Sequence, residues 1–439
     1  MPSKFSPQAL ALMIITGLVL MPEAASAAAT PNAAVTYSPP DMTDVSAAQL
    51  RKYYAWRDRM DWVLAPIHSR ADLDAYLKAK TNSDSPLNAL APDARRRFLA
   101  SLKFGRSGVG GFSTADLQYL SAVQVYRILA LFGMQAYTPD IVPIPTRPVA
   151  PQTAGARPGK VTAVQKRFDA WWDFVQRSGG NFGSNGAAAA REYQKLFAAD
   201  QTPQKIRGAG VEDLRLLLRA AAQAASATED VRSGRDAMLD LDELERRRAA
   251  APPDYRQAYE ALMVTKQFAA ARKLYQAQPV VAPSPPPEFR DEAGGVAPGT
   301  PTVLKVSTER REVIRRPVDL SGPARVVILT DPACHFCAYF LDALQSRPQL
   351  RRRLEQHALW IAPPSGVFDF DTLQQWNRAH PAERIDIMYR LQEWPMVKDL
   401  AVPTFYFLQN GSLVTTVVGW PRSGNFEKLQ VALKKIGLP

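Results

Sequence analysis

The sequence is poor in the residues that bind metals and form disulfides: its 439 residues include only two cysteines, Cys334 and Cys337, and four histidines. Two cysteines are too few for a disulfide-stapled mini-domain or for a four-cysteine zinc site. Ala338 follows the second cysteine, so the Cys-x-x-Cys-His motif for covalent haem is absent. His335 and His357 do not readily complete a tetrahedral site with the thiols, because residues 334 and 335 point apart at a helix start. We therefore expect neither a metal nor another cofactor.

The N-terminal apolar run is also too short to span a bilayer comfortably. It covers residues 9–21, a length of 13 residues, whereas a transmembrane helix needs about 20. Lys4 precedes it, and Pro22 and the stretch Ala-Ser-Ala at 25–27 follow, which is the pattern of a secretory signal peptide. An uncleaved anchor is the alternative. Cleavage would leave no transmembrane helix and would place the chain in the periplasm or another extracytoplasmic compartment, where a Cys-x-x-Cys pair is relevant to redox chemistry.

Acidic residues are outnumbered by basic ones. Lys and Arg total 54 and Asp and Glu total 42, which gives a net charge of +12 at pH 7. Removal of residues 1–27 would take away Lys4 and Glu23, one charge of each sign, so the mature chain would keep that net charge. Such basicity favours contact with anionic surfaces in general, but no nucleic-acid-binding motif accompanies it. With 46% hydrophobic and 22% charged residues, the chain is neither disordered throughout nor a polytopic membrane protein.

Proline-rich stretches divide the chain into the parts of a multidomain α+β protein, in which all-helical regions are joined by linkers to a C-terminal α/β domain. We expect a signal peptide at 1–27, a disordered leader at 28–45, a helical domain at 46–137, a proline-rich linker at 138–159, a helical domain at 160–278, a proline- and glycine-rich linker at 279–300, and the α/β domain at 301–439. Within the second helical domain, residues 255–279 are expected to form two antiparallel helices.

The first helical domain has recognisable helix boundaries. Its helices are expected at about 70–80, 90–104 and 114–132. Ser113 and Asp116 have the spacing of a capping box at the start of the third helix, and Gly133 suits its C-terminal cap. The glycine-rich stretch 105–111 is expected to be a turn between helices.

After residue 300 the pattern changes to strands alternating with helices. We expect strands at 303–307, 313–314, 325–330 and 357–361, a helix from Cys334 to about 355, a helical insert over 371–400, a hairpin of strands 405–408 and 413–418, and a terminal helix over 426–436. The strand at 325–330 is apolar enough to lie at the centre of a sheet. Asn410 and Gly411 suit the tight turn of the hairpin.

The Cys-x-x-Cys pair carries the chemistry that the sequence predicts. Two thiols three residues apart at a helix start can close an intramolecular disulfide, and the positive end of the helix dipole stabilises a thiolate at Cys334. Cys334 is therefore the candidate nucleophile. Cys337, one turn further along, is the candidate resolving thiol, which would release a partner from a mixed disulfide. His335 between them either favours the thiolate when protonated or is a solvated side chain with little effect.

The stretch Thr-Asp-Pro-Ala-Cys-His-Phe-Cys at 330–337 resembles the active-site stretch of the bacterial periplasmic disulfide isomerases of the DsbC and DsbG type, in the thioredoxin-fold superfamily. Val402, Pro403 and Thr404, followed by an apolar strand and a hairpin turn, are similar to that superfamily's cis-proline strand. The resemblance covers residues 301–439. It implies a thioredoxin-like fold there, a cis peptide bond before the proline and a substrate-contact role for these three residues; a strand-entry proline is the alternative.

The chain departs from that family in two respects. Ile328 stands where thioredoxins carry a buried acid that assists proton transfer. Asp331 is a candidate proton acceptor in its place, with a turn residue before Pro332 as the alternative role. The N-terminal two-thirds do not resemble the dimerisation domain of those isomerases, which puts isomerase activity in doubt. Four large residues of the insert either shape substrate access or are core residues: Trp376, Met388, Tyr389 and Trp394.

Two functions of different classes follow from the sequence. The first is an exported enzyme, a thiol:disulfide oxidoreductase that exchanges disulfides with cysteine-containing client proteins and with a redox partner protein. The second is a cell-envelope scaffold or assembly factor, in which the helical domains bind assembly partners and the thioredoxin-like module is redox-silent. Oxidase, reductase and isomerase use the same pair of thiols, so the motif does not choose the direction of exchange.

Overall fold

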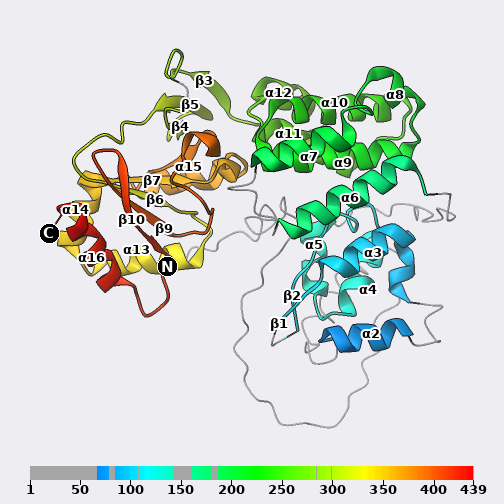
Figure 1. Ribbon diagram of the computed structural model, residues 1–439, viewed down its shortest axis with the longest axis horizontal. Coiled ribbons are helices and arrows are strands. Elements are labelled where there is room, and N and C mark those ends of the chain that lie inside the picture. Colours follow the sequence, from blue (N-terminus) through cyan, green and yellow to red (C-terminus); the bar gives the residue numbers. More distant parts are fainter. Residues whose placement is uncertain are drawn as a thin grey trace, which may run out of the picture. The chain divides into compact units, whose positions relative to one another are not determined.

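The computed structural model describes residues 67–78, 85–105, 108–142, 161–178, 186–282, 284–297 and 299–438. The chain divides into two compact units, Met1–Val161 and Thr162–Pro439 (Figure 1). The expected signal peptide and leader, residues 1–45, lie outside the described residues. Of the expected linker 138–159, only residues 138–142 are described, and they contain a short helix.

The first unit combines helices with a small β-hairpin. Its helices are α2 (Arg70–Lys78), α3 (Pro92–Ser101), α4 (Ala122–Ala130) and α5 (Thr138–Ile141), with 3-10 turns η4 (Pro86–Ala89) and η5 (Gln135–Tyr137). Strands β1 (Lys103–Gly105) and β2 (Gly108–Gly111) pair antiparallel where the sequence predicted a helix end and a turn. Phe98 of α3 makes edge-to-face contacts with Phe112 and Phe132, so the segment after the hairpin packs into the same core as the helices.

The capping box expected at Ser113 is wrong, because α4 begins further along the chain. The hydroxyl of Ser121 accepts a hydrogen bond from the Gln124 backbone N–H, and the Gln124 side chain accepts one from the Ser121 N–H. This reciprocal pattern is the capping box of α4. Asp116 instead forms a buried ion pair with Arg97 at 2.9 Å. Such a charge-assisted hydrogen bond is stronger than the helix-capping hydrogen bond that the local sequence pattern predicts for this carboxylate.

The second unit begins with a helical region. Its helices are α6 (Ala163–Arg177), α7 (Gly186–Phe197), α8 (Pro203–Gly208), α9 (Val211–Thr228), α10 (Val231–Arg246), α11 (Pro252–Val264) and α12 (Phe268–Ala277). Helix α9 packs against α6, α7, α10 and α11. Its buried face consists mainly of leucine and alanine: Leu214, Leu217, Leu218, Ala220, Ala221, Ala224 and Ala225. The predicted helices are therefore present, including the antiparallel pair α11 and α12.

The second unit continues with a mixed sheet of eight strands among the described residues. The strands are β3 (Glu288–Asp291), β4 (Thr302–Val306), β5 (Glu312–Pro317), β6 (Arg325–Leu329), β7 (Ala358–Ala362), β8 (Ile385–Met388), β9 (Thr404–Gln409) and β10 (Ser412–Val418). Their order is β10-β9-β6-β7-β8-β4-β5-β3. The pairs β6–β7, β7–β8 and β3–β5 are parallel, and the other neighbours are antiparallel. The apolar strand β6 is flanked on both sides, as its composition predicts.

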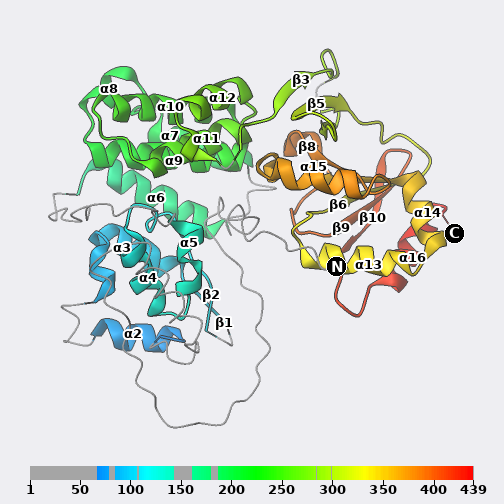
Figure 2. The same cartoon turned by 180° about the vertical axis from the view of Figure 1, so that it is seen from behind.

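The helices of the α/β part differ from the sequence prediction in two places. They are α13 (His335–Gln345), α14 (Pro348–His357), α15 (Phe370–Ala379) and α16 (Phe426–Lys435), with 3-10 turns η6 (Pro279–Val281), η7 (Pro364–Asp369) and η8 (Leu391–Glu393). The helix expected from Cys334 to 355 is split, because Pro348 has no backbone N–H to continue α13. The helical insert expected over 371–400 is correct for α15 only, since β8 and η8 follow it (Figure 2).

The two faces of the sheet bury different side chains. Along β6, Val326 and Ile328 belong to one core cluster, whereas Val327 and Leu329 belong to another. This alternation is the two-residue period of a strand. Because all four residues are buried, β6 lies between two covered faces and its C-terminal end can hold a shielded site.

Aromatic side chains cover the first face and a loop covers the second. Phe340 of α13 lies edge-on to Phe405 of β9 and to Trp420, with ring centroids 4.8 and 4.7 Å apart. On the second face, Trp394 and Val397 come from the segment between β8 and β9 and pack with Tyr406 of β9. That segment leads directly into the proline loop at 402–404.

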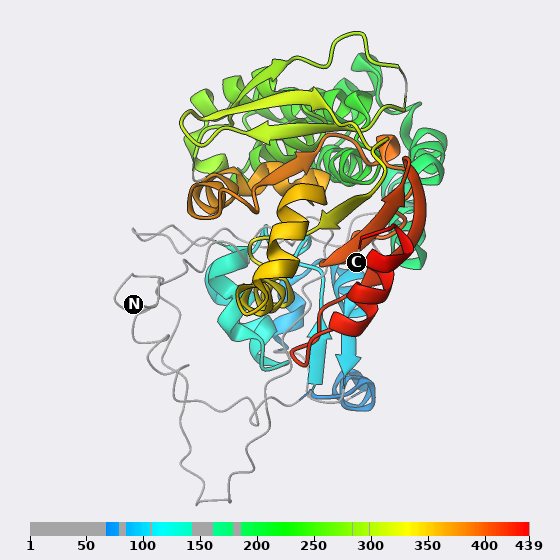
Figure 3. The same ribbon diagram turned by 90° about the vertical axis from the view of Figure 1, so that its left-hand side faces the viewer.

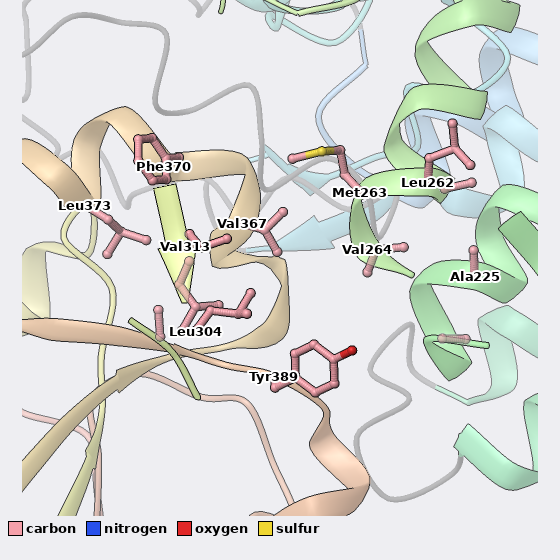
Figure 4. Close-up of a cluster of buried hydrophobic side chains, with 14 of the residues drawn as sticks. Ala225, Leu262, Met263, Val264, Leu304, Val313, Val367, Phe370, Leu373 and Tyr389 are labelled. Carbon is pink, nitrogen blue, oxygen red and sulfur yellow. The ribbon is translucent and has the colours of Figure 1, made fainter. Parts of the chain in front are cut away.

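The helical region and the sheet share one core (Figure 4). Val264 at the end of α11 belongs to the same cluster of buried side chains as Leu304, Val313 and Val367. The expected linker 279–300 contains β3, which pairs with β5. The structure therefore differs from the expected arrangement of independent domains on either side of that linker, because the apolar ends of α11 and α12 are buried against the sheet.

Polar contacts also join the helical region to the segment before the proline loop. The Oε1 of Glu229 accepts a hydrogen bond from the Leu391 N–H at 3.3 Å, and the Gln392 side-chain amide donates to the Thr228 carbonyl at 3.1 Å. These bonds satisfy backbone groups at the end of α9 and at the start of η8. The helical region thus fixes one end of the segment that leads to the proline loop.

Candidate functional site

The two cysteines lie where β6 meets α13, at the C-terminal end of the strand. The intervening turn is held by Asp331, whose carbonyl oxygen accepts from the Cys334 N–H at 3.1 Å and whose Oδ1 accepts from the Ala333 N–H at 2.8 Å. Cys334 is the N-cap residue of α13. Its sulfur therefore sits beside the unpaired N–H groups of the first helical turn.

The two thiols differ in their exposure. Both are free thiols; Cys334 is 9% exposed and Cys337 is 3% exposed. The Cys334 thiol donates a hydrogen bond to the Val402 carbonyl oxygen at 3.6 Å. The outer thiol of the pair is therefore the one that faces the proline loop, as expected for a nucleophile and a shielded resolving thiol.

The two thiols also differ in acidity. The hydrogen bond from the Cys337 thiol, together with the backbone N–H groups of Cys337 and Phe336, lowers the pKa of Cys334 to about 7 despite its burial. The same hydrogen bond raises the pKa of Cys337, and burial and the charge of the Cys334 thiolate add to this rise. Near neutral pH the site can thus hold one thiolate, at Cys334, next to one thiol.

Thr330 is a residue of this site that sequence reasoning missed. It is buried, and its side chain hydrogen-bonds to Cys337, which partly offsets the rise in the pKa of that thiol. The signal available in the sequence was its position as the only hydroxyl-bearing residue between β6 and the first cysteine. A hydroxyl at this position can donate to a Cys337 thiolate when one forms.

The proline loop lies against the cysteines as the sequence predicts. The Val402–Pro403 peptide bond is cis. Pro403 and Thr404 are buried, Val402 is half-buried, and the Thr404 hydroxyl donates to the Ala401 carbonyl at 2.6 Å. The structure brings Val402 to Cys334, and contact of Val402, Pro403 and Thr404 with a substrate remains a prediction.

One carboxyl group, Asp331, lies near the thiols, and a second, Asp369, lies near Asp331. Burial raises the pKa of Asp331, although the hydrogen bond from Ala333 opposes the shift. Burial and the charge of Asp331 raise the pKa of Asp369, at the end of η7, to about 7. Asp331 has the expected turn geometry, and its role as a proton acceptor stays a prediction. Asp369 was missed because it lies 38 positions after Asp331 in the sequence, a distance that no local motif spans.

The remaining site predictions concern His335 and the insert. His335 begins α13, but its side chain lies outside the described part of the structure. Met388 and Trp394 are completely buried and Tyr389 nearly so, which favours the core interpretation over substrate access. Trp376 is partly buried and its indole N–H donates to the Glu383 carbonyl at 3.0 Å.

Other kinds of site receive no support within the described ranges. No group of three or more His, Cys, Asp or Glu side chains there could hold a metal ion. In the same ranges, every helix is too short or too polar to cross a membrane. No protein-family model, curated protein or solved structure matches this chain.

Proposed function

We propose that this chain is an exported thiol:disulfide oxidoreductase. The observation that carries the proposal is the asymmetry of the two thiols. Cys334 is the more exposed and has a pKa of about 7, whereas Cys337 is more buried and has a raised pKa. A structural disulfide needs no such difference between its two cysteines. Exchange needs one thiol that ionises readily and a second thiol that stays protonated until it attacks the mixed disulfide.

Exchange proceeds in two balanced steps. The Cys334 thiolate attacks a client disulfide, forms a mixed disulfide with one client sulfur and expels the other as a thiolate. Cys337 then loses its proton and attacks the Cys334 sulfur, which closes the Cys334–Cys337 disulfide and releases the second client thiolate. The client gains two electrons and the pair loses two. Run backwards, the same steps insert a disulfide into a client.

The strand order supports a thioredoxin-like core. Strands β7, β6, β9 and β10 lie side by side; β6 and β7 are parallel, and β9 and β10 are antiparallel to each other. Helix α13, with the cysteines at its start, follows β6, and α16 follows β10. This arrangement and the proline loop beside Cys334 are what the resemblance to the DsbC and DsbG isomerases implies. The proposed clients are extracytoplasmic proteins with cysteines, and a second redox protein would regenerate the pair.

The reduction potential tests the proposal. We expect the mature chain, equilibrated with glutathione buffers, to have a potential between about −270 and −120 mV, the range of exchange enzymes. A structural bond lies below about −300 mV, and such a value would favour the redox-silent scaffold. The readout is the fraction of oxidised pair, measured by alkylation and mass spectrometry.

Trapping tests the assignment of roles. A Cys337→Ala variant should accumulate mixed disulfides through Cys334, because the resolving thiol is gone. The matched control is Cys334→Ala, which keeps one thiol but should trap little, since Cys337 is buried and weakly acidic. Equal trapping by the two variants would contradict the assignment.

A further inference from the structure

Thr330 lies on the face of the sheet that carries α13. Ile328 of β6 belongs to the same core cluster as Phe340 of α13, so it lies on the face that α13 and α16 cover (Figure 3). The Thr330 N–H donates to the Ile361 carbonyl at 2.8 Å, which continues the pairing of β6 with β7 by one residue. Because side chains alternate between the two faces of a strand, the Thr330 side chain lies on the same face as Ile328, near the start of α13.

The Cys337 sulfur lies among hydrogen-bond donors. The Thr330 hydroxyl donates to this sulfur, and so does the backbone N–H of Asp331. The carboxyl group of Asp331 is engaged elsewhere, because its Oδ1 accepts from the Ala333 N–H at 2.8 Å. Thr330 is 2% exposed and Cys337 is 3% exposed. Two donors from the end of β6 therefore converge on one buried sulfur.

These donors stand where negative charge develops during exchange. Cys337 must lose its proton before it can attack the mixed disulfide on Cys334. Strand β6 contains no acidic residue that could take this proton, and Ile328 occupies the position of the buried acid of thioredoxins. A hydrogen bond to a charged acceptor is about twice as strong as one between neutral groups. The two donors therefore stabilise Cys337 more as a thiolate than as a thiol.

We propose that Thr330 is a catalytic residue of the second exchange step, in which its hydroxyl and the Asp331 N–H stabilise the thiolate that forms on Cys337. This role rests on the proposed exchange function and explains how the resolving thiol is activated without a buried acid on β6. The Cys337 S–H bond breaks, the Cys337–Cys334 bond forms, and the bond between Cys334 and the client sulfur breaks. The proton passes to water and then to the client thiolate that leaves, so one thiol is consumed and one is formed.

Ellman's reagent, an aromatic disulfide, separates the two steps in one experiment. When the reduced mature chain reacts with one equivalent, attack by Cys334 releases the first aromatic thiolate and attack by Cys337 releases the second. Stopped-flow absorbance therefore shows two phases. We expect Thr330→Val to slow the second phase at least about tenfold, because a hydrogen bond to a charged group is lost. The first phase should stay nearly unchanged, since the acidity of Cys334 depends mainly on Cys337 and Phe336.

Two further variants control for the effect of the substitution on the fold. Thr330→Ser keeps the hydroxyl and should restore the second phase. Thr138→Val removes another buried threonine hydroxyl, which donates to the Gln135 carbonyl in the first unit, and should change neither phase. Thermal melts report whether each variant is folded. A second phase of wild-type rate in Thr330→Val would overturn the proposal, and so would equal slowing of both phases.

An equilibrium measurement tests the same hydrogen bond without exchange. In a Cys334→Ala background, Cys337 is the one remaining thiol of the chain, so its alkylation reports its own ionisation. Addition of Thr330→Val should slow alkylation at every pH at which Cys337 is mostly protonated, and addition of Thr330→Ser should not. Equal rates with threonine and valine at position 330 would contradict donation from the hydroxyl to the sulfur.

Failure of the exchange function would look different from failure of this role. A wild-type chain that releases only the first aromatic thiolate does not close the Cys334–Cys337 disulfide, and this result would overturn both proposals. Two normal phases in the wild type and in Thr330→Val would leave the exchange function standing and would exclude only the role of Thr330. A slow second phase in Thr330→Val that serine restores would support both.

Discussion

The side-chain nitrogen of Lys266, in the turn between α11 and α12, donates a hydrogen bond to the Pro364 carbonyl oxygen, 98 residues away in sequence, at 3.3 Å. It also donates to the Val264 carbonyl at 2.9 Å. Lys266 is 8% exposed, and burial lowers its pKa to about 8, while the charge of Glu229 opposes that shift. A buried ammonium group therefore joins the helical region to η7, the turn that ends at Asp369.

Loss of this cation should destabilise the second unit. We expect Lys266→Met to lower the free energy of unfolding by about 3 kcal/mol, because two carbonyl groups lose their donor and Glu229 loses a buried counter-charge. Urea denaturation of the mature chain measures the change. Lys205→Met, at an exposed lysine of α8, is the control and should have an effect within about 0.5 kcal/mol. Equal effects would show that the buried contact does not stabilise the unit.

Alkylation rates should titrate with Cys334. We expect the reduced chain to react with iodoacetamide at Cys334 with a midpoint near pH 7, because the thiolate is the reacting species. In Cys337→Ala the midpoint should move up, since the hydrogen bond from Cys337 is the main cause of the lowered pKa. Peptide mapping identifies the modified residue. An unchanged midpoint in the variant would contradict the coupling between the two thiols.

The charge of Asp331 should oppose the Cys334 thiolate. That charge raises the pKa of Cys334, so Asp331→Asn should shift the alkylation midpoint to lower pH while the amide oxygen keeps the hydrogen bond to Ala333. Asp319→Asn is a matched control, because Asp319 makes the same kind of turn, with Oδ1 accepting from the Ser321 N–H at 2.8 Å. If both variants shifted the midpoint alike, a local effect of Asp331 would be ruled out.

Asp369 should make stability depend on pH. Burial and the charge of Asp331 raise its pKa from 3.8 to about 7, so the folded chain binds this proton more tightly than the unfolded chain does. Its contribution to stability is fully present below pH 3.8 and is lost as pH rises through 7. We therefore expect Asp369→Asn to be more stable than the wild type at pH 8, by about 1 kcal/mol or more, and equally stable near pH 4.

Asp371 provides the contrast to that prediction. Although burial opposes the shift, hydrogen bonds from Arg311 and Ser284 lower the pKa of Asp371. Asp371→Asn should therefore reduce the melting temperature at pH 8, the opposite sign to Asp369→Asn. Melting temperatures of the two variants across pH 4 to 8 make the comparison. A gain in stability at pH 8 in both variants would mean that burial alone, and not hydrogen bonding, determines how these two carboxyl groups affect stability.

Two phenylalanines of α13, one helical turn apart, should differ sharply on truncation. Phe340 is 1% exposed and packs on Phe405 and Trp420, whereas Phe336 is 43% exposed. Phe340→Ala should cost about 3–5 kcal/mol because it leaves a cavity in the core, and Phe336→Ala less than about 1 kcal/mol. Denaturant midpoints give both values. Comparable losses would contradict the assignment of α13's buried face.

Local pattern was sufficient where neighbouring residues alone decide the conformation. Asn410 and Gly411 adopt positive φ angles of 50° and 77° in the hairpin turn, because the short turn requires left-handed backbone and these residues tolerate it. Likewise, α16 and the α11–α12 pair appear where apolar residues recur at helical spacing. The start of α13 at the cysteines was predictable for the same reason.

Local pattern failed where a distant partner decides. Residues 385–388 were expected within a helical insert, yet they form β8 because β7 and β4 offer pairing on both sides. Asp116 was expected to cap a helix, but it forms an ion pair with Arg97 instead. Asp369 comes near Asp331 only because β7 and η7 return the chain to the end of β6.

The sequence by itself determined which residues can carry chemistry: a single pair of thiols spaced for exchange, at the start of a helix and ahead of a proline strand. Only the tertiary structure decided how those thiols differ. The pKa of Cys334 depends on a hydrogen bond and backbone N–H groups within α13, and its exposure depends on the proline loop, which leads into β9, the strand paired with β6. The physical reason is that burial acts through space: the proline loop, 68 residues further along the chain, shields a thiol whose acidity is set mainly by its neighbours in α13.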